Sequence, residues 1–171
     1  MSWSRTAVAV AVSSWLAACG FQPLYAERPD AANVAAELGE IYMVAPKGRS
    51  ELLLYNELRD RLTPAGEPER PRYRLDLTLT IIKQPLAFAR DQTATRQNVT
   101  AAAQYALRDR ADNSVVVTGA ARAIAAYNVV RSEFGTLSAE QDAERRAVKE
   151  VGAEIHTRLG VFFQRRGASG S

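Results

Sequence analysis

The sequence predicts an α+β domain: a two-layer sandwich with two helices packed on one face of a mostly antiparallel four-stranded sheet. Residues 73–82 alternate apolar and polar side chains, as a half-buried strand does. Residues 148–162 carry apolar side chains at helical spacing. The element order reads β-α-β-β-β-α, and this order fits helices gathered on one face of an antiparallel sheet. A length of 171 residues, 47% of them hydrophobic, suits one such domain.

The first two elements are a short strand and a helix. The strand is expected at Glu40–Ala45, which is apolar and ends at Pro46. Ser50 can cap the helix that follows, and the segment Thr63–Gly66 stops it. Leucines at a spacing of four residues form its apolar face: Leu54, Leu58 and Leu62.

The middle of the chain is expected to form the rest of the sheet. Tyr73–Ile82 is the second strand, and Val99–Leu107 continues the same alternation as a third. Asp109–Asn113 has the residue types of a turn, so Val115–Ala126 should return beside the third strand as a hairpin. Several small residues predict that another element packs closely on this fourth strand: Gly119, Ala120, Ala121 and Ala123.

The last element is a predicted helix. Ser138 and Gln141 have the spacing of a capping box at its start. Gln164–Ser171 has the composition of a frayed tail. An apolar stripe faces the core: Val148, Val151, Ile155, Leu159 and Phe162.

The amino terminus has the layout of a secretory signal peptide. Arg5 precedes the uncharged run Thr6–Ala18, which is too short to serve as a membrane span. The residues Leu16, Ala17, Ala18 and Cys19 resemble a bacterial lipobox, which predicts cleavage before Cys19 and acylation of that residue. The alternative is an ordinary secretory signal with a cysteine beside its cleavage site. The predicted organisation is a cleaved signal peptide (1–18), a lipidated N-terminus and tether (19–37), an α/β domain (38–163) and a flexible tail (164–171).

Composition and charge limit the classes of function. A single cysteine and a single histidine exclude an intrachain disulfide, a cysteine-based zinc site and the common multi-histidine metal sites, so no metal or cofactor is expected. Residues 70–131 hold ten Lys or Arg and four Asp or Glu, a net charge of +6. This excess suits an anionic lipid head group, or it is simply a solvated sheet face. Nucleic acid is not an expected partner for an exported protein.

Two motifs give the chain a resemblance to a known family. The segment Cys19–Tyr25 reads CGFQPLY directly behind the lipobox. Near the other end, Ala126–Val130, Phe134–Leu137 and Ala139–Ala143 mark a transition from the last strand into the last helix. Together these segments resemble the LPS-assembly lipoprotein family LptE, in its alphaproteobacterial form. The fold of that family matches the element order read from the sequence.

The resemblance implies a function. Members are outer-membrane lipoproteins, held by acyl chains on the periplasmic side. They act as plug and assembly partner of the LptD β-barrel and help to deliver lipopolysaccharide to the outer leaflet. Gly20 stands where an aspartate would retain a lipoprotein at the inner membrane, so the outer membrane is the expected location.

The resemblance also implies a contact with lipopolysaccharide. Phe88–Ala94 aligns with the segment where members carry a basic residue implicated in that contact, so Arg90 is the first candidate. Lys83 and Arg96 are its neighbours in the sequence. Guanidinium groups suit phosphate, although Arg90 could instead be a solvated loop residue. Some members carry a lysine at the start of the last helix, where this chain has Ser138, which leaves a second basic contact there in doubt.

An enzyme is not expected. His156 lies beside the apolar stripe of the last helix, where a structural role is the more common one. The motifs G-x-S-x-G, HExxH and a phosphate-binding glycine loop do not occur. Two alternatives remain: a free-standing periplasmic lipid-binding chaperone, and a lipid-anchored hydrolase that uses a carboxylate pair.

Overall fold

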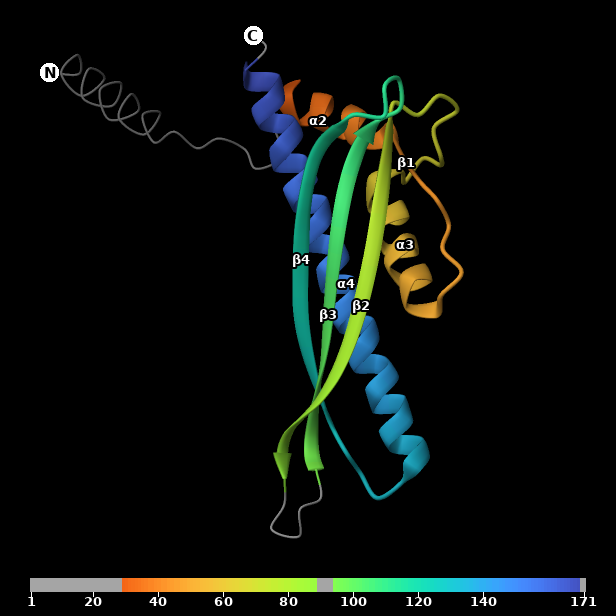
Figure 1. Cartoon of the computed structure of the whole chain (residues 1–171), viewed down its shortest axis with the longest axis vertical. Helices are drawn as coiled ribbons and strands as arrows, with labels where there is room; N and C mark the ends of the chain where they lie inside the picture. The colour runs from red at the N-terminus through yellow and green to blue at the C-terminus, as the bar shows by residue number, and fades with distance from the viewer. Residues whose placement is uncertain (1–28, 89–93, 170–171) are drawn as a thin grey trace, which may run out of the picture.

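The computed structural model describes residues 29–88 and 94–169, and these form an α+β arrangement of three helices and one four-stranded sheet (Figure 1). The predicted fold class is confirmed, with one helix more than expected. In chain order the elements are α2 (Pro29–Gly39), β1 (Ile41–Met43), α3 (Arg49–Leu62), β2 (Tyr73–Phe88), β3 (Ala94–Asp109), β4 (Val115–Asn128) and α4 (Glu133–Ser169).

The strands lie in the order β1-β2-β3-β4. β1 pairs in parallel with the first residues of β2, and the other pairs are antiparallel. The predicted hairpin is therefore confirmed. Asn113 adopts a φ of 59° in its turn, a left-handed conformation that asparagine tolerates better than most residues. β2 and β3 are each 16 residues long, which is longer than the alternation of apolar residues predicted.

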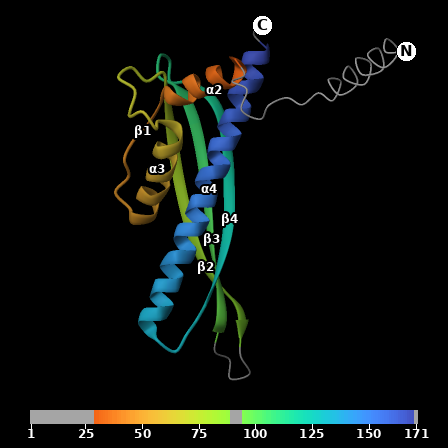
Figure 2. The same ribbon diagram turned by 180° about the vertical axis from the view of Figure 1, so that it is seen from behind.

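The helices cover one face of the sheet. α4 passes behind the strands in Figure 1 and in front of them in Figure 2, with α3 beside it. The opposite face, which we call the helix-free face, carries no helix among the described residues. The core lies between the two layers, and the sheet contributes these buried side chains to it: Tyr73, Leu75, Val99, Ala101, Ala103, Leu107, Ala121 and Ala123.

The predicted stripe of α4 faces the core. Val148, Val151, Ile155 and Leu159 are all buried, and Phe162 is half-buried and packed against the core. The prediction missed Phe163, which is more deeply buried than Phe162. The ring of Phe163 lies 5.4 Å from the ring of Tyr73. The expectation that something packs closely on β4 is also correct, since α4 lies against its small residues.

Helix α2 was not predicted, because its residues were assigned to the tether 19–37. Its apolar signal is weak: Leu38 is buried and Val34 is half-buried, among small residues. The structure shows what holds it. α2 packs on α4, and the hydroxyl of Tyr73 donates a 2.9 Å hydrogen bond to Glu37.

Both helix starts were also predicted wrongly. α4 begins at Glu133 because Ser132, and not Ser138, caps it: the backbone N–H of Gly135 donates to Ser132 Oγ at 3.2 Å. The helix continues to Ser169, through most of the segment that was predicted as a frayed tail. Ser50 lies inside α3, and its hydroxyl donates to Glu144 of α4 instead of capping its own helix.

Gly119 of β4 leaves space for an aromatic ring. A Cβ atom at this position would lie 2.4 Å from the hydroxyl oxygen of Tyr105, the buried residue opposite it on β3. Gly119→Ala should therefore displace that ring and lower the free energy of unfolding by about 1–3 kcal/mol. Urea unfolding followed by circular dichroism measures the change. Gly39→Ala is the matched control, since a Cβ there meets no atom within 4 Å. Equal stability of the two variants would contradict the prediction.

Candidate functional site

The predicted site residues fall into two groups. Lys83 and Arg96 lie within the described residues, in the second half of β2 and near the start of β3. The structure does not bring them together. Lys83 is in register with the core residue Val99 and lies on the helix-covered side, whereas Arg96 alternates to the helix-free face. The others lie outside the described residues: Leu16, Ala17, Ala18, Cys19 and Arg90.

Lys83 belongs to a cluster of polar side chains that joins the three long strands to α4. We call Lys83, Gln97, Tyr127 and Glu140 the Glu140 cluster. The ammonium group of Lys83 donates to Glu140 Oε1 at 2.5 Å. The hydroxyl of Tyr127 lies 3.0 Å from Glu140 Oε2 and 2.8 Å from Gln97 Oε1. Both carboxylate oxygens of Glu140 are therefore engaged, and the positive charge of Lys83 already has a partner.

The charges of this cluster fix its protonation states. The hydrogen bond from Lys83 lowers the pKa of Glu140, and the bond from Tyr127 acts in the same direction. Burial raises the pKa of Tyr127 to about 12, with further contributions from its hydrogen bond to Glu140 and from the charge of that residue. At neutral pH the Glu140 carboxylate is thus ionised and the Tyr127 phenol is neutral.

Removal of the Glu140 charge should change the titration of Tyr127. In Glu140→Gln, the pKa of Tyr127 should fall from about 12 toward its ordinary value of 10.0, because the negative charge is lost while burial remains. In the wild type, the stabilisation linked to Tyr127 is present below pH 10 and is lost as the pH rises toward 12. Phenolate absorbance during an alkaline titration measures the midpoint, and Tyr127→Phe identifies the signal of this residue. An unchanged midpoint would contradict the assigned contact.

A second basic feature lies along β4, beside α4. An open groove of about 520 Å³ is lined by the guanidinium-bearing residues Arg96, Arg122 and Arg146, with Glu150 and Glu154 on α4. Arg146 has partners: it pairs with Asp142 at 2.9 Å and donates to the backbone oxygen of Ala126 at 3.3 Å.

Two of the three guanidinium groups in the groove have no partner among residues 29–88 and 94–169. Arg96 and Arg122 make no hydrogen bond or ion pair with any other residue that the structure describes, and both are exposed. Sequence reasoning missed Arg122, although it is the one charged residue of β4. The groove therefore offers two uncommitted positive charges to an anionic ligand.

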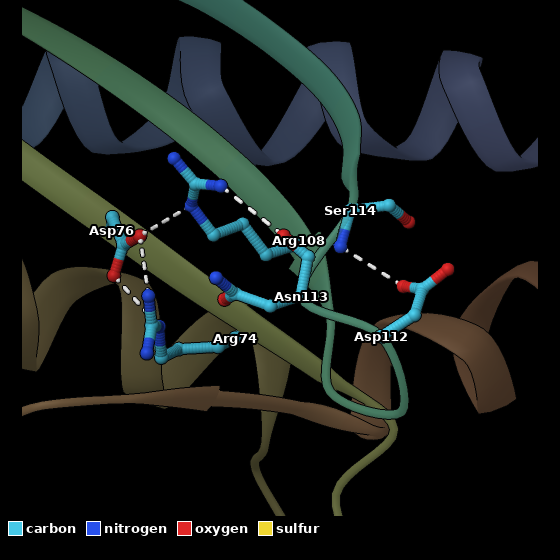
Figure 3. A network of polar contacts seen from close by, with 6 residues as sticks. All are labelled: Arg74, Asp76, Arg108, Asp112, Asn113 and Ser114. Carbon is cyan, nitrogen blue, oxygen red and sulfur yellow. Dashed lines mark hydrogen bonds and ion pairs between the residues drawn. The ribbon is translucent and has the colours of Figure 1, made fainter.

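A third polar group has a structural role. Arg74 and Arg108 lie directly opposite each other on β2 and β3, and Asp76 neutralises part of this like-charge pair (Figure 3). Asp76 Oδ2 lies 3.1 Å from Arg108 Nε, and Asp76 Oδ1 lies 3.0 Å from Arg74 Nε. Arg108 also donates to the backbone oxygen of Asn113 at 3.2 Å. The network thus ties the β3–β4 turn to β2, and its carboxylate is fully used.

A smaller apolar cavity of about 190 Å³ lies between α3 and β2. Val44 at its mouth is 64% exposed, whereas Leu54, Tyr55 and Leu75 are buried. The hydroxyl of Tyr55 donates to Glu67 at 2.9 Å, and this bond raises the pKa of the phenol. Two carboxylate residues, Glu51 and Asp76, also line the cavity, and Asp76 is already paired with Arg74 and Arg108. We assign the cavity no chemistry.

Few side chains among the described residues are suited to bind a metal ion or to act as a catalytic base. Among residues 29–88 and 94–169, no three His, Cys, Asp or Glu side chains are grouped as metal ligands. His156 is half-buried on α4, and burial lowers its pKa, with the nearby charge of Arg61 acting in the same direction. In the same part of the chain, no helix combines the length and apolarity that a membrane span requires.

Comparisons with known proteins identify a family and a fold. The family model described as "LptE: Lipopolysaccharide-assembly" matches residues 38–159. No curated protein sequence matches the chain.

Three solved structures share its fold. A candidate lipoprotein from Caulobacter crescentus CB15 is 22% identical, with a TM-score of 0.65 over 78% of this chain and 97% of that one. The minor lipoprotein from Acinetobacter baumannii is 18% identical, with a TM-score of 0.53 over 71% and 90%. Lipoprotein B from Nitrosomonas europaea is 15% identical, with a TM-score of 0.55 over 71% and 82%.

Proposed function

Because the chain belongs to the LptE family of lipopolysaccharide-assembly proteins, we propose that it is the plug and assembly partner of the LptD β-barrel. In this proposal acyl chains on Cys19 hold it on the periplasmic side of the outer membrane, where it helps to deliver lipopolysaccharide to the outer leaflet. It acts by binding, without catalysis and without a cofactor. The observation that carries the proposal is the family match, which spans the α/β domain from the end of α2 into α4.

The surface of the domain supports a place inside a barrel. Wide bacterial barrels have polar, water-filled interiors. The helix-free face is largely polar, with exposed Thr78, Thr80 and Gln104 on neighbouring strands. An acyl anchor would confine the domain to the membrane of its partner and so raise its effective concentration there.

The candidate lipopolysaccharide contacts Arg96 and Lys83 differ in how available their charges are to a phosphate. Arg96 is exposed, has no partner among the described residues and could bind a phosphate through its guanidinium group. Lys83 is less available, because a phosphate would have to compete with Glu140 for its ammonium group. Arg90 remains a candidate through the family resemblance.

The contact at Arg90 can be tested by charge reversal. Arg90→Glu should weaken the binding of purified protein to lipopolysaccharide by roughly tenfold or more, since an ionic hydrogen bond to phosphate contributes about 1.5–3 kcal/mol. Binding of labelled lipopolysaccharide measures the change, and thermal unfolding shows whether the domain remains folded. Arg59→Glu, at an exposed position on α3, serves as the matched control. Unchanged binding by Arg90→Glu would remove this residue from the site.

The partnership with the barrel is tested by co-purification from outer membranes. Tagged full-length protein, extracted in detergent, should recover LptD at near-equal amounts, identified by mass spectrometry. An unrelated outer-membrane lipoprotein with the same tag is the control. Depletion of the protein should also reduce surface lipopolysaccharide. Recovery of the tagged domain without the barrel, together with bound lipid, would favour a free-standing lipid-binding chaperone and overturn the proposal.

A further inference from the structure

We propose that the outer edge of β4 is a strand-docking site that takes an extended, acidic segment of the barrel partner. This inference rests on the proposed function, because it names the surface through which the domain would bind that barrel. The occupant would add a fifth strand to the sheet. Main-chain hydrogen bonds would provide affinity, and side chains beside the groove would provide selectivity.

The edge of β4 has backbone groups available for pairing. β4 is the last strand in the sheet order, and no described residue range forms a strand against its outer side. The backbone oxygen of Ala126 accepts a hydrogen bond from Arg146 of α4, which indicates that the backbone groups of this residue point outward. Alternation along the strand then directs the N–H and C=O groups of Thr118, Ala120, Arg122 and Ile124 outward too.

β4 has few of the features by which edge strands avoid pairing, which are commonly prolines, bulges or several charges. Its one register irregularity lies at Val115–Val117, before the outward-pointing residues named above. On the other side of the sheet, the edge strand β1 is only 3 residues long. The edge of β2 beyond β1 has Pro85 and two register irregularities after it. β4 carries no proline, and Arg122 is its one charged residue. The edge of β4 is therefore the one suited to strand addition.

The charges beside this edge indicate the chemistry of the occupant. Arg96 is in register with Asn128, six residues along β4 from Arg122. Both arginines lie on the helix-free face. Because a strand rises by roughly 3.3 Å per residue, six residues separate their backbones by about 20 Å. A single phosphate group cannot span that distance, but an extended peptide of about seven residues does. Acidic side chains on the helix-free side of such a peptide would meet both free guanidinium groups.

The groove favours a different partner over a second copy of this chain. Antiparallel pairing of two β4 edges near their centres would bring the two Arg122 side chains directly opposite each other or onto adjacent diagonal positions. Like charges at such positions destabilise a strand pair. On the side toward α4, Glu150 and Glu154 line the groove. The docked segment should therefore carry its acidic residues on the helix-free side and neutral or basic residues toward α4.

Hydrogen exchange on the complete complex tests the inference. Recovery of LptD with the wild-type protein is scored first, because its absence would refute the proposed function and this inference with it. In the recovered complex, the outward amides of Thr118, Ala120, Arg122 and Ile124 should exchange at least about tenfold more slowly than in the free protein. A contiguous segment of the barrel should gain the same protection. Recovery of the barrel without slower exchange at these amides would overturn strand docking alone.

Charge reversal adds a second measurement. Arg122→Glu should reduce recovery of the barrel several-fold and weaken the protection, whereas Arg165→Glu, at an exposed position on α4, should leave both unchanged. Equal recovery and equal protection with both variants would contradict the acidic occupant.

Lipopolysaccharide micelles, added without the barrel, form the last arm of the experiment. If they alone protect the four amides, the edge binds lipid and the inference is wrong.

Discussion

The variant Cys19→Ser should carry no acyl chains and should be lost from the outer-membrane fraction. Cys19 is the single cysteine of the chain and stands directly after the lipobox residues. Each methylene buried in a bilayer contributes about 0.8 kcal/mol, so several chains on one residue hold a protein firmly and their loss releases it. Metabolic labelling with palmitate, followed by membrane fractionation, measures the effect.

A control for this variant keeps the cysteine and changes its neighbour. Ala18→Gly preserves a small residue before the cleavage site, so labelling and fractionation should remain as in the wild type. Persistent acyl labelling of Cys19→Ser would show that the lipid is attached elsewhere, and the predicted lipobox would then be wrong.

Ile155→Ala should lower the free energy of unfolding by about 2–5 kcal/mol. Ile155 is fully buried on the face of α4 that packs against the core, so its truncation leaves a cavity that the surrounding side chains fill only in part. For a domain with a total stability of about 5–15 kcal/mol, this is a large fraction. Urea unfolding measures the loss as a shift of the transition midpoint at constant slope.

The matched control for Ile155→Ala lies on the same helix. Val161 is 39% exposed, and its replacement by alanine should change stability by no more than about 0.5 kcal/mol. If the two variants proved equally stable, α4 could not be the helix that closes the core.

The sheet could be predicted from the sequence because its signal is local. The odd-numbered residues from Tyr73 to Ile81 face the core and the even-numbered ones do not, so the period of two is visible without any tertiary information. Helix α2 gives no comparable signal, since its stability depends on contacts with α4 and Tyr73, more than thirty residues away. The start of α4 was misplaced because Ser132 and Ser138 are both plausible caps, and sequence alone does not show which one the chain uses.

The candidate site could be predicted in part. Alternation along the strands places Lys83 on the same face as the core residues and Arg96 on the opposite face. Their separation could therefore have been predicted from the sequence. The partner of Lys83 was not, because Glu140 lies 57 residues away and meets it only when α4 crosses the sheet. Arg122 was overlooked among small residues, because its importance comes from being unpaired at an edge, and pairing is a property of the folded sheet.

The position of α4 after all four strands has a consequence during export. The strands reach the periplasm first, and until residues 133–169 follow, α4 cannot cover the alanine-rich side of β4. A chain at that stage displays apolar surface together with an open strand edge, a combination that promotes aggregation. A folding chaperone that shields the sheet until the final helix arrives would therefore be needed most during that interval.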